Sequence, residues 1–437
     1  MQNIDTLVHA KWLIPVEPQA TVYENYAIAI DKGRILALLP SDKANTQYKA
    51  NEVHQLDKHA LLPGLINTHG HAAMTLMRGL ADDLPLMTWL NEHIWPTEAK
   101  WVSNEFVYDG SLIACAEMLR GGTTCFTDMY FFPEEVVRAA EQAQIRASVG
   151  LIVIDFPSAY AQDADEYLRK GLALHDQLRG NPLIKTSFAP HAPYTVADEA
   201  LQKVNTLAEE LDIPIQIHLH ETEDEINQAV KETGKRPIER LETLGLLSSR
   251  LIAVHMTQLT DKDIQTLATY AVQVAHCPES NLKLASGFCP VQKLMGAEIN
   301  VSLGTDGAAS NNDLDMFSEM RTAALLAKAV AKDARAVSAE QALRMATING
   351  AKALGLDKEI GSLEVGKAAD MIAVDLSALE TQPMYNPVSQ LVYVANRQQV
   401  SDVWVAGKHV VKQHQLTTLD NEQLCKTAQQ WQQKIKS

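Results

Sequence analysis

Eight short apolar runs, rich in β-branched residues, recur along the middle of the chain, and segments of helical periodicity separate them. The runs are residues 60–67, 123–127, 147–154, 184–189, 213–219, 251–254, 271–275 and 298–304. Strands that alternate with helices pair in parallel, because each helix returns the chain to the same end of the sheet. Eight such units over roughly 250 residues predict a (β/α)8 barrel. We place the barrel at residues 60–360.

The helical segments show apolar residues on one face. The clearest is 195–211, where Leu201, Val204 and Ala208 repeat at helical spacing. Thr195 with Asp198 predicts a cap at its N-terminus. Further helices are expected at 134–144, 165–178, 237–247, 261–269 and 316–331.

The two ends of the chain have a different pattern. Residues 1–59 and 361–437 contain strand and hairpin signals without intervening helices, apart from a helical segment at 421–436. Neither end is large enough to bury a good core alone. We therefore predict one small β-sandwich domain built from both chain ends, with a terminal helix.

Polar residues follow seven of the eight predicted strands. In (β/α)8 barrels the active site lies at the carboxyl ends of the strands. The residues at these ends are His69, His71, Asp128, His191, His218, Glu221, His255, His276 and Asp306. Their repeated placement is not expected of histidines scattered over a surface, and it predicts an active site.

Four of these residues form a candidate metal site. His69 and His71 are alternate residues after one strand and can share a face. A single His-x-His pair more often belongs to the surface or the core, but His218 and Asp306 make the set specific. Three imidazoles and a carboxylate suit one catalytic Zn²⁺, and Fe²⁺ or Mn²⁺ accept the same ligands.

Several motifs resemble the amidohydrolase superfamily. They are the PGLINTHGH segment at 63–71, His218, His255, the GTDG segment at 304–307 and the GSLEVGKAAD segment at 361–370. The resemblance implies a barrel beside a composite β-sandwich, with His69, His71, His218 and Asp306 as metal ligands. The fourth strand ends in Ala189-Pro190-His191 where two-metal members carry a bridging lysine. The chain thus resembles the one-metal deaminase branch.

Within that branch, four segments resemble deaminases of 5′-methylthioadenosine and S-adenosylhomocysteine. They are 95–98, 190–194, 217–221 and 305–312. The resemblance implies that Glu98 holds the ribose hydroxyls and that His191 and Ser310 contact the nucleoside. Some relatives place arginines after the third strand, whereas residues 147–156 contain none here. We therefore expect 5′-methylthioadenosine to be preferred, with S-adenosylhomocysteine and adenosine as weaker substrates.

Catalytic roles follow from the chemistry of deamination. Glu221 is expected to take a proton from the attacking water and deliver it to the purine ring. Asp306 would pass a second proton to the departing ammonia, and His255 would hydrogen-bond the nucleophile. The alternatives are that Glu221 only favours a helix N-terminus and that His255 is a core histidine. The roles of His220, His276 and Asp128 stay open.

Composition limits the kinds of partner and the cellular location that we expect. The net charge is −16, and there is no cluster of Lys and Arg to bind nucleic acid. No run approaches the length of a membrane span, and no signal peptide is expected. Five cysteines without a C-x-x-C pair indicate a reducing cytoplasm and exclude the deaminase class with a P-C-x-x-C motif. A homo-oligomer is compatible with the sequence.

Two rival functions stay open. One is another enzyme of the same branch that acts on guanine, 8-oxoguanine or an s-triazine. The other is a metal-free binding homologue that has lost catalysis.

Overall fold

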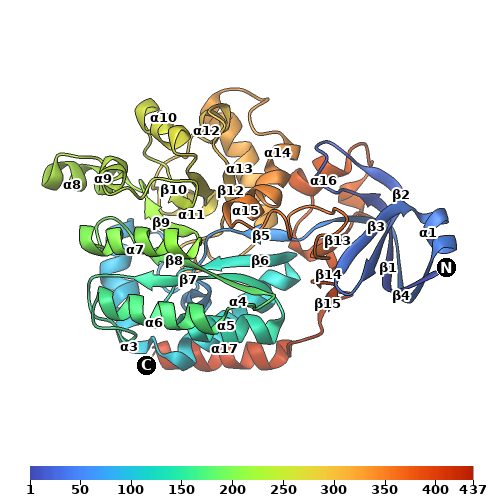
Figure 1. Cartoon of the computed structure of the whole chain (residues 1–437), viewed down its shortest axis with the longest axis horizontal. Coiled ribbons are helices and arrows are strands. Elements are labelled where there is room, and N and C mark those ends of the chain that lie inside the picture. Colours follow the sequence, from blue (N-terminus) through green and yellow to red (C-terminus); the bar gives the residue numbers. More distant parts are fainter. Residues whose placement is uncertain (437) are drawn as a thin grey trace.

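The computed structural model describes residues 1–436, which form two eight-stranded sheets with helices packed around one of them (Figure 1). The strands of the barrel sheet run parallel and follow one another in chain order. They are β5 (Leu65–Asn67), β6 (Thr123–Asp128), β7 (Arg146–Val153), β8 (Ile184–Pro190), β9 (Ile215–Leu219), β10 (Leu251–His255), β11 (Gln273–His276) and β12 (Val301–Leu303). The last strand meets the first where the Thr68 amide donates to the Leu303 carbonyl at 2.9 Å. The predicted (β/α)8 barrel is confirmed.

The first predicted run is divided between the two sheets. Residues up to Pro63 belong to β4 (Tyr48–Pro63) of the second sheet, and β5 begins at Leu65. The chain changes sheet at Gly64, where a Cβ atom would lie 2.0 Å from the Thr124 hydroxyl oxygen. This close approach requires glycine and brings the chain into the barrel just before its first polar strand end.

Helices cover the outside of the barrel. Those that match predicted segments are α5 (Pro133–Ala143), α6 (Ala164–Gln177), α7 (Asp198–Leu211), α9 (Pro237–Thr243), α10 (Asp261–Thr269) and α13 (Met316–Ala331). The other α-helices between β9 and β14 are α8 (Glu223–Thr233), α11 (Pro278–Lys283), α12 (Val291–Gly296), α14 (Ala339–Met345), α15 (Ile348–Ala353) and α16 (Pro387–Tyr393).

The cap predicted for α7 is wrong. Its N-cap is Ala197, which has no capping side chain, and the Asp155 carboxylate accepts a hydrogen bond from the Ala197 amide instead. Thr195 contacts the turn around His191, where its hydroxyl lies 3.0 Å from the His191 Nδ1 atom. A carboxylate from the end of β7 thus replaces the local cap.

The second sheet contains strands from both chain ends, as predicted. Its strand order is β16-β15-β14-β13-β4-β1-β2-β3. The strands other than β4 are β1 (Gln2–Leu13), β2 (Tyr23–Asp31), β3 (Arg34–Pro40), β13 (Met371–Asp375), β14 (Val400–Val405), β15 (Lys408–Lys412) and β16 (Gln415–Leu416). A shared core joins the halves, and Trp404 from one end packs with Val8 and Ile28 from the other. The helix α1 (Ser41–Gln47) precedes β4.

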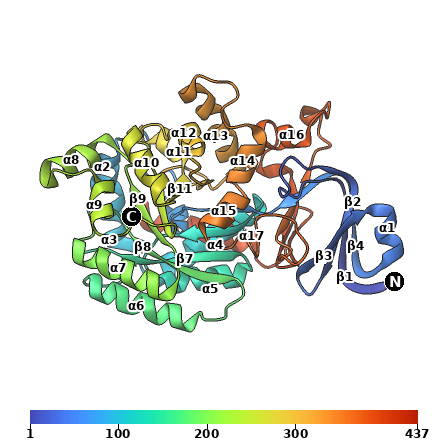
Figure 2. The same cartoon turned by 45° about the horizontal axis from the view of Figure 1, so that its top comes forward.

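A long segment connects β5 and β6, and its helices α2 and α3 lie at the end of the barrel opposite β1–β4 (Figure 2). It contains η1 (Ala72–Met77), α2 (Leu86–Trp89), the π-helix η2 (Leu90–Ile94), α3 (Trp95–Trp101) and α4 (Asn104–Arg120). The predicted terminal helix is α17 (Asn421–Lys436), and its Trp431 indole donates to the Asp109 carboxylate of α4 at 2.8 Å.

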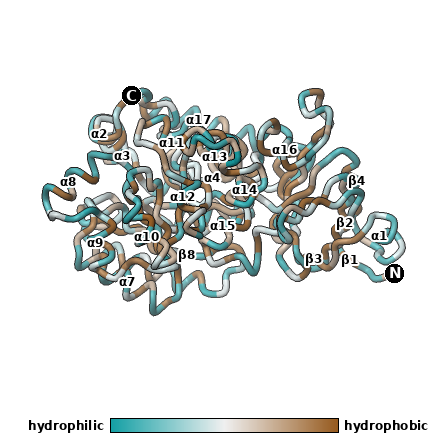
Figure 3. The backbone as a smooth tube through the Cα atoms, turned by 90° about the horizontal axis from the view of Figure 1, so that it is seen from above, coloured by the Kyte–Doolittle hydropathy of each residue, from teal (hydrophilic) through white to brown (hydrophobic). Residues whose placement is uncertain are grey.

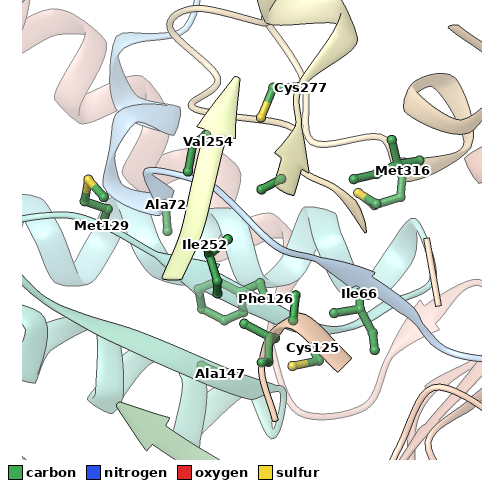
Figure 4. Close-up of a cluster of buried hydrophobic side chains, with 14 of the residues drawn as sticks. Ile66, Ala72, Cys125, Phe126, Met129, Ala147, Ile252, Val254, Cys277 and Met316 are labelled. Atoms are coloured by element: carbon green, nitrogen blue, oxygen red, sulfur yellow. The ribbon is translucent and has the colours of Figure 1, made fainter. Parts of the chain in front are cut away.

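Apolar side chains fill the barrel, and Figure 4 shows Ile66, Phe126 and Ile252 among them. Hydrophilic stretches lie on the periphery, of which α8 is an example in Figure 3. Among the described residues, no helix has the length and hydrophobicity needed to cross a membrane.

Candidate active site

Three histidines and an aspartate meet at the carboxyl ends of β5, β9 and β12. The Asp306 Oδ1 atom lies 3.1 Å from His71 Nε2 and 3.5 Å from His69 Nε2. The Nε2 atoms of His69 and His218 are 3.1 Å apart. These atoms belong to groups of side chains close enough to share a metal ion. The structure therefore brings together all four residues that the sequence predicted as ligands.

Backbone carbonyls hold two of the imidazoles. The Nδ1 atom of His71 lies 2.6 Å from the Met129 carbonyl oxygen, and that of His218 lies 2.7 Å from the His191 carbonyl oxygen. A carbonyl can only accept, so each Nδ1 carries a proton and each Nε2 faces the centre, where its lone pair would be available to a metal ion. This second layer of contacts is typical of metal-binding histidines.

Asp306 is held by hydroxyl groups and by an unusual backbone conformation. Its Oδ2 atom accepts hydrogen bonds from Ser280 at 2.6 Å and Ser310 at 2.7 Å. Its φ of 61° lies in the left-handed region, which costs free energy in a residue other than glycine. Burial alone would raise the pKa of Asp306, but hydrogen bonds with His69 and His71 hold that pKa well below its usual value. The carboxylate is therefore ionised at the centre.

A close approach of the chain also shapes this corner. At Gly304, just before Asp306, a Cβ atom would lie 2.8 Å from the Cβ atom and from the amide nitrogen of His69. A side chain at this position would push β12 away from His69. Gly304 therefore lets the strand ends that carry His69 and Asp306 meet.

Glu221 and His255 lie beside the four residues. The Oε2 atom of Glu221 is 3.7 Å from the Nε2 atom of His255. Burial and the charge of Asp306 raise the pKa of Glu221 to about 8. The N-cap of α8 is Thr222, whose hydroxyl accepts from the Glu225 amide, so the Glu221 side chain is free of that task. Its pKa suits a group that both accepts and donates protons near neutral pH.

A cavity of about 450 Å³ opens over this centre. It is lined by His71, His191, His218, Glu221, His255, Asp306 and Ser310, and by apolar residues of the segment between β5 and β6, among them Trp89 and Trp95. This volume lies within the range of pockets that bind small molecules. The predicted catalytic residues, the substrate-binding residues and three of the four ligands therefore share one cavity.

Glu98 reaches the cavity from α3. The Tyr130 hydroxyl donates to its Oε1 atom at 2.6 Å, and burial raises the pKa of Glu98 to about 7 despite this hydrogen bond. Tyr130 follows β6, so two segments distant in sequence fix the carboxyl group. One oxygen is held by the protein, which leaves the other free to accept a hydrogen bond from a ligand.

The end of β7 and the loop after it contribute mostly apolar side chains to the cavity, with Ser158 as the polar exception. Ile152, Ile154 and Phe156 line it, whereas Asp155 caps α7. Among residues 1–436, no arginine or lysine lines this cavity. Two arginines from other segments that could have met a ligand carboxylate are engaged elsewhere: Arg78 forms an ion pair with Glu117, and Arg321 donates to the Ala395 carbonyl.

The residues whose roles the sequence left open, His220, Asp128 and His276, differ in their hydrogen bonds. Both ring nitrogens of His220 have backbone partners, the Gln258 carbonyl at 3.0 Å and the Ile238 amide at 3.2 Å, so this histidine is structural. Asp128 accepts from the Ala72 amide at 2.7 Å and holds the chain just after His71. His276 is buried, and its Nδ1 atom has no hydrogen-bond partner among the described residues.

Three residues that contribute to the site were not predicted from the sequence. Asn281 and Ser280 lie in α11, where Asn281 contacts His255 and Ser280 contacts Asp306. Tyr130 holds Glu98. A Cys-Pro-Glu-Ser-Asn segment after β11 marks a helix start, but nothing in its composition indicates which strand ends its side chains will reach. Ser310, expected to contact the ligand, lines the cavity and directs its hydroxyl to Asp306.

A (β/α)8 barrel whose strand ends gather three histidines and an aspartate defines a metal-dependent hydrolase. The amidohydrolase family model matches residues 60–410. The chain belongs to the amidohydrolase family.

Related proteins match this chain over nearly its whole length. The 5-methylthioadenosine/S-adenosylhomocysteine deaminase of Teredinibacter turnerae is 51% identical over 433 residues, which cover 99% of this chain and 98% of that protein. A crystal structure of an adenosine deaminase from Xanthomonas campestris with bound zinc is 53% identical, with a TM-score of 0.99 over 100% of this chain and 99% of that one. The guanine deaminase of E. coli, at 23% identity and a TM-score of 0.83 over 93% of this chain and 99% of that one, shares the fold.

Proposed function

We propose that this protein hydrolyses 5′-methylthioadenosine to 5′-methylthioinosine and ammonia. The observation that carries the proposal is a single apolar cavity that ends on a predicted metal centre and a buried carboxyl group, Glu221. The names of relatives that are 51% identical over nearly the whole chain support this substrate class.

One divalent ion, zinc, is proposed to bind His69, His71, His218 and Asp306. The donor set fits it, because Nε2 lone pairs and an ionised carboxylate oxygen converge within hydrogen-bonding distances of one another. The zinc bound in the related Xanthomonas structure supports this choice. When bound, the ion lowers the pKa of a water molecule towards about 7 and so makes a nucleophile available at neutral pH.

Glu221 is proposed as the proton carrier. It would receive a proton from the attacking water and deliver it to the ring nitrogen beside the carbon that loses its amino group. His255, 3.7 Å from Glu221, would hydrogen-bond the attacking oxygen. Asp306 would accept the remaining hydroxyl proton and pass it to the leaving ammonia. Assistance of this kind is typically worth roughly 10²- to 10⁴-fold in rate.

Glu98, His191 and Ser310 are proposed to orient the nucleoside. The oxygen of Glu98 that Tyr130 leaves free would accept hydrogen bonds from the ribose hydroxyls. A fixed carboxyl group of this kind favours a nucleoside over a free base, which argues against guanine, 8-oxoguanine or an s-triazine as the best substrate.

A cytoplasmic location is proposed from the cysteines. Four of them are buried free thiols and the fifth is an exposed free thiol, as expected in a reducing compartment.

The apolar wall formed by Ile152, Ile154 and Phe156 supports a preference for the methylthio group. S-adenosylhomocysteine carries a carboxylate and an ammonium in place of the methyl group, and a buried carboxylate needs a cationic partner. Because Arg78 and Arg321 have other partners, the substrate carboxylate would lose its hydrating water without gaining a cationic partner. A cost of a few kcal/mol corresponds to roughly hundredfold discrimination.

Two variants test the proposed chemistry with 5′-methylthioadenosine as substrate. We expect His218→Ala to lose both the metal and the activity. Glu221→Gln should keep the metal and the fold but lose at least about a hundredfold in kcat, since only proton transfer is removed. The matched control is Glu223→Gln, the same change at an exposed residue two positions away. Full metal content in His218→Ala, or a loss below about tenfold in Glu221→Gln, would contradict these roles.

A further inference from the structure

A second group of metal-binding side chains lies in the composite sheet, outside the barrel. It consists of Glu52 and His54 of β4 and His409 of β15. One ligand atom from each residue lies within 4.8 Å of the others. The barrel residues described above take no part in it.

Two strands from opposite ends of the chain bring these residues together. Strand β13 pairs with β4 only at residues 59–63, and beyond that pairing the ring of His54 is centred 5.0 Å from the ring of His409, at 87°. Glu52 and His54 are alternate residues of one strand and therefore point to the same face. The group thus joins the N-terminal part of the chain to the C-terminal part.

Two nitrogens in this group make no hydrogen bond. The His54 Nε2 and His409 Nδ1 atoms are buried and make no hydrogen bond within the described part of the chain. Unpaired buried polar atoms are rare because each costs free energy. Stacking of His409 on Trp404, with ring centres 4.3 Å apart, places the ring but leaves Nδ1 unsatisfied. A bound cation would satisfy both nitrogens.

His409 is oriented as a ligand would be. Its Nε2 atom lies 2.9 Å from the Asp402 Oδ1 atom, so Nε2 carries the proton and Nδ1 presents the lone pair. A carboxylate behind an imidazole is the usual outer partner of a metal-bound histidine. On the opposite side, the Glu52 Oε2 atom is 3.4 Å from His54 Nε2.

Each imidazole of the group has a carboxylate beside it. The Glu52 Oε2 atom is 3.4 Å from His54 Nε2, and the Asp402 Oδ1 atom is 2.9 Å from His409 Nε2. Glu52 is 62% exposed in its side chain, so an ion from solvent can reach the group and water can complete its coordination. Two imidazoles and a carboxylate suit Zn²⁺ and other borderline divalent ions.

We propose that Glu52, His54 and His409 bind a second divalent metal ion, which fastens the two chain ends to each other in the composite sheet. The proposal is independent of the proposed deaminase activity, because none of these residues lines the barrel cavity. The ion would be structural, since it lies between strands rather than in a substrate pocket.

Metal content of the whole protein tests this site. After equilibrium dialysis against micromolar free Zn²⁺, we expect about two ions per wild-type chain and about one in Glu52→Gln and in His409→Ala. Glu52 is exposed, so its variant should fold even if His409→Ala does not. The matched control is His414→Ala, which removes an exposed histidine from the same end of the chain and should keep both ions.

Activity and stability separate this site from the barrel site. Both sheet variants should retain wild-type kcat/KM with 5′-methylthioadenosine, while the rise in Tm that Zn²⁺ gives the wild type should become smaller. If no substrate is turned over, the metal count alone still decides the proposal. Equal metal content in the wild type and Glu52→Gln, whether one ion or two, would overturn it.

Discussion

The Nδ1 atom of His255 lies 2.9 Å from the Oδ1 atom of Asn281, and this contact turns the opposite nitrogen of the ring towards Glu221. Asn281 comes from α11 and is buried, with 1% of its surface exposed. Because the amide oxygen only accepts, it keeps the proton on Nδ1. Asn281 is therefore a positioning residue for His255.

We predict that Asn281→Ala lowers kcat by roughly 10- to 100-fold with little change in KM, because His255 loses its orientation but the pocket stays intact. Asn281→Asp keeps an acceptor at the same place and should recover part of the loss. Steady-state kinetics on metal-loaded protein measures both. The assignment would be wrong if Asn281→Ala changed KM alone.

The apolar end of β7 gives a gain-of-function prediction. Phe156 lines the cavity and is 43% exposed, so a longer polar side chain can reach solvent there. Phe156→Arg should improve kcat/KM for S-adenosylhomocysteine relative to 5′-methylthioadenosine by roughly tenfold or more, because the arginine supplies a partner for the carboxylate. Phe156→Leu is the control and should not shift this ratio towards S-adenosylhomocysteine.

The buried side chain of Glu319 leads us to predict that the free energy of unfolding depends on pH. It is fully buried in α13, and its Oε1 atom accepts from Asn311 at 2.6 Å. Burial and the neighbouring Glu279 raise its pKa well above 4.5. The folded protein therefore keeps a proton that the unfolded chain releases above about pH 4.5, so this group lowers stability as the pH rises.

Glu319→Gln removes that titration and keeps an acceptor for Asn311. Relative to wild type, the variant should gain stability from pH 5 to pH 8, by up to about 1.4 kcal/mol for each pH unit. Urea unfolding at the two pH values gives the difference. A gain that is the same at both would show that Glu319 does not titrate between them.

A buried ion pair joins the barrel to the composite sheet. Arg146 of β7 contacts Asp370, just before β13, at 2.9 and 3.1 Å, and both side chains are almost fully buried. Asp370→Asn leaves the guanidinium without a charged partner and should cost about 3–5 kcal/mol in unfolding free energy. The double variant Arg146→Met with Asp370→Asn should recover much of this loss. Equal stability of Asp370→Asn and wild type would contradict a structural role for the pair.

The sequence predicted the features that depend on local pattern. Strand ends carry His69, His218 and Asp306 because a barrel places all such ends on one face, and the composite sheet followed from helix-poor flanks. Contacts between distant segments could not be predicted this way. The Asn281–His255 contact, the Tyr130–Glu98 contact and the cap that Asp155 provides for α7 each depend on tertiary geometry.

The cavity is proposed to deaminate a nucleoside with an apolar 5′ substituent. The most direct measurement is kcat/KM for ammonia release by the metal-loaded protein from 5′-methylthioadenosine, S-adenosylhomocysteine, adenosine and guanine. We predict that 5′-methylthioadenosine is the best of the four, with S-adenosylhomocysteine roughly a hundredfold lower. Equal or better use of S-adenosylhomocysteine would contradict the selectivity, and guanine as the best substrate would contradict the assignment to a nucleoside.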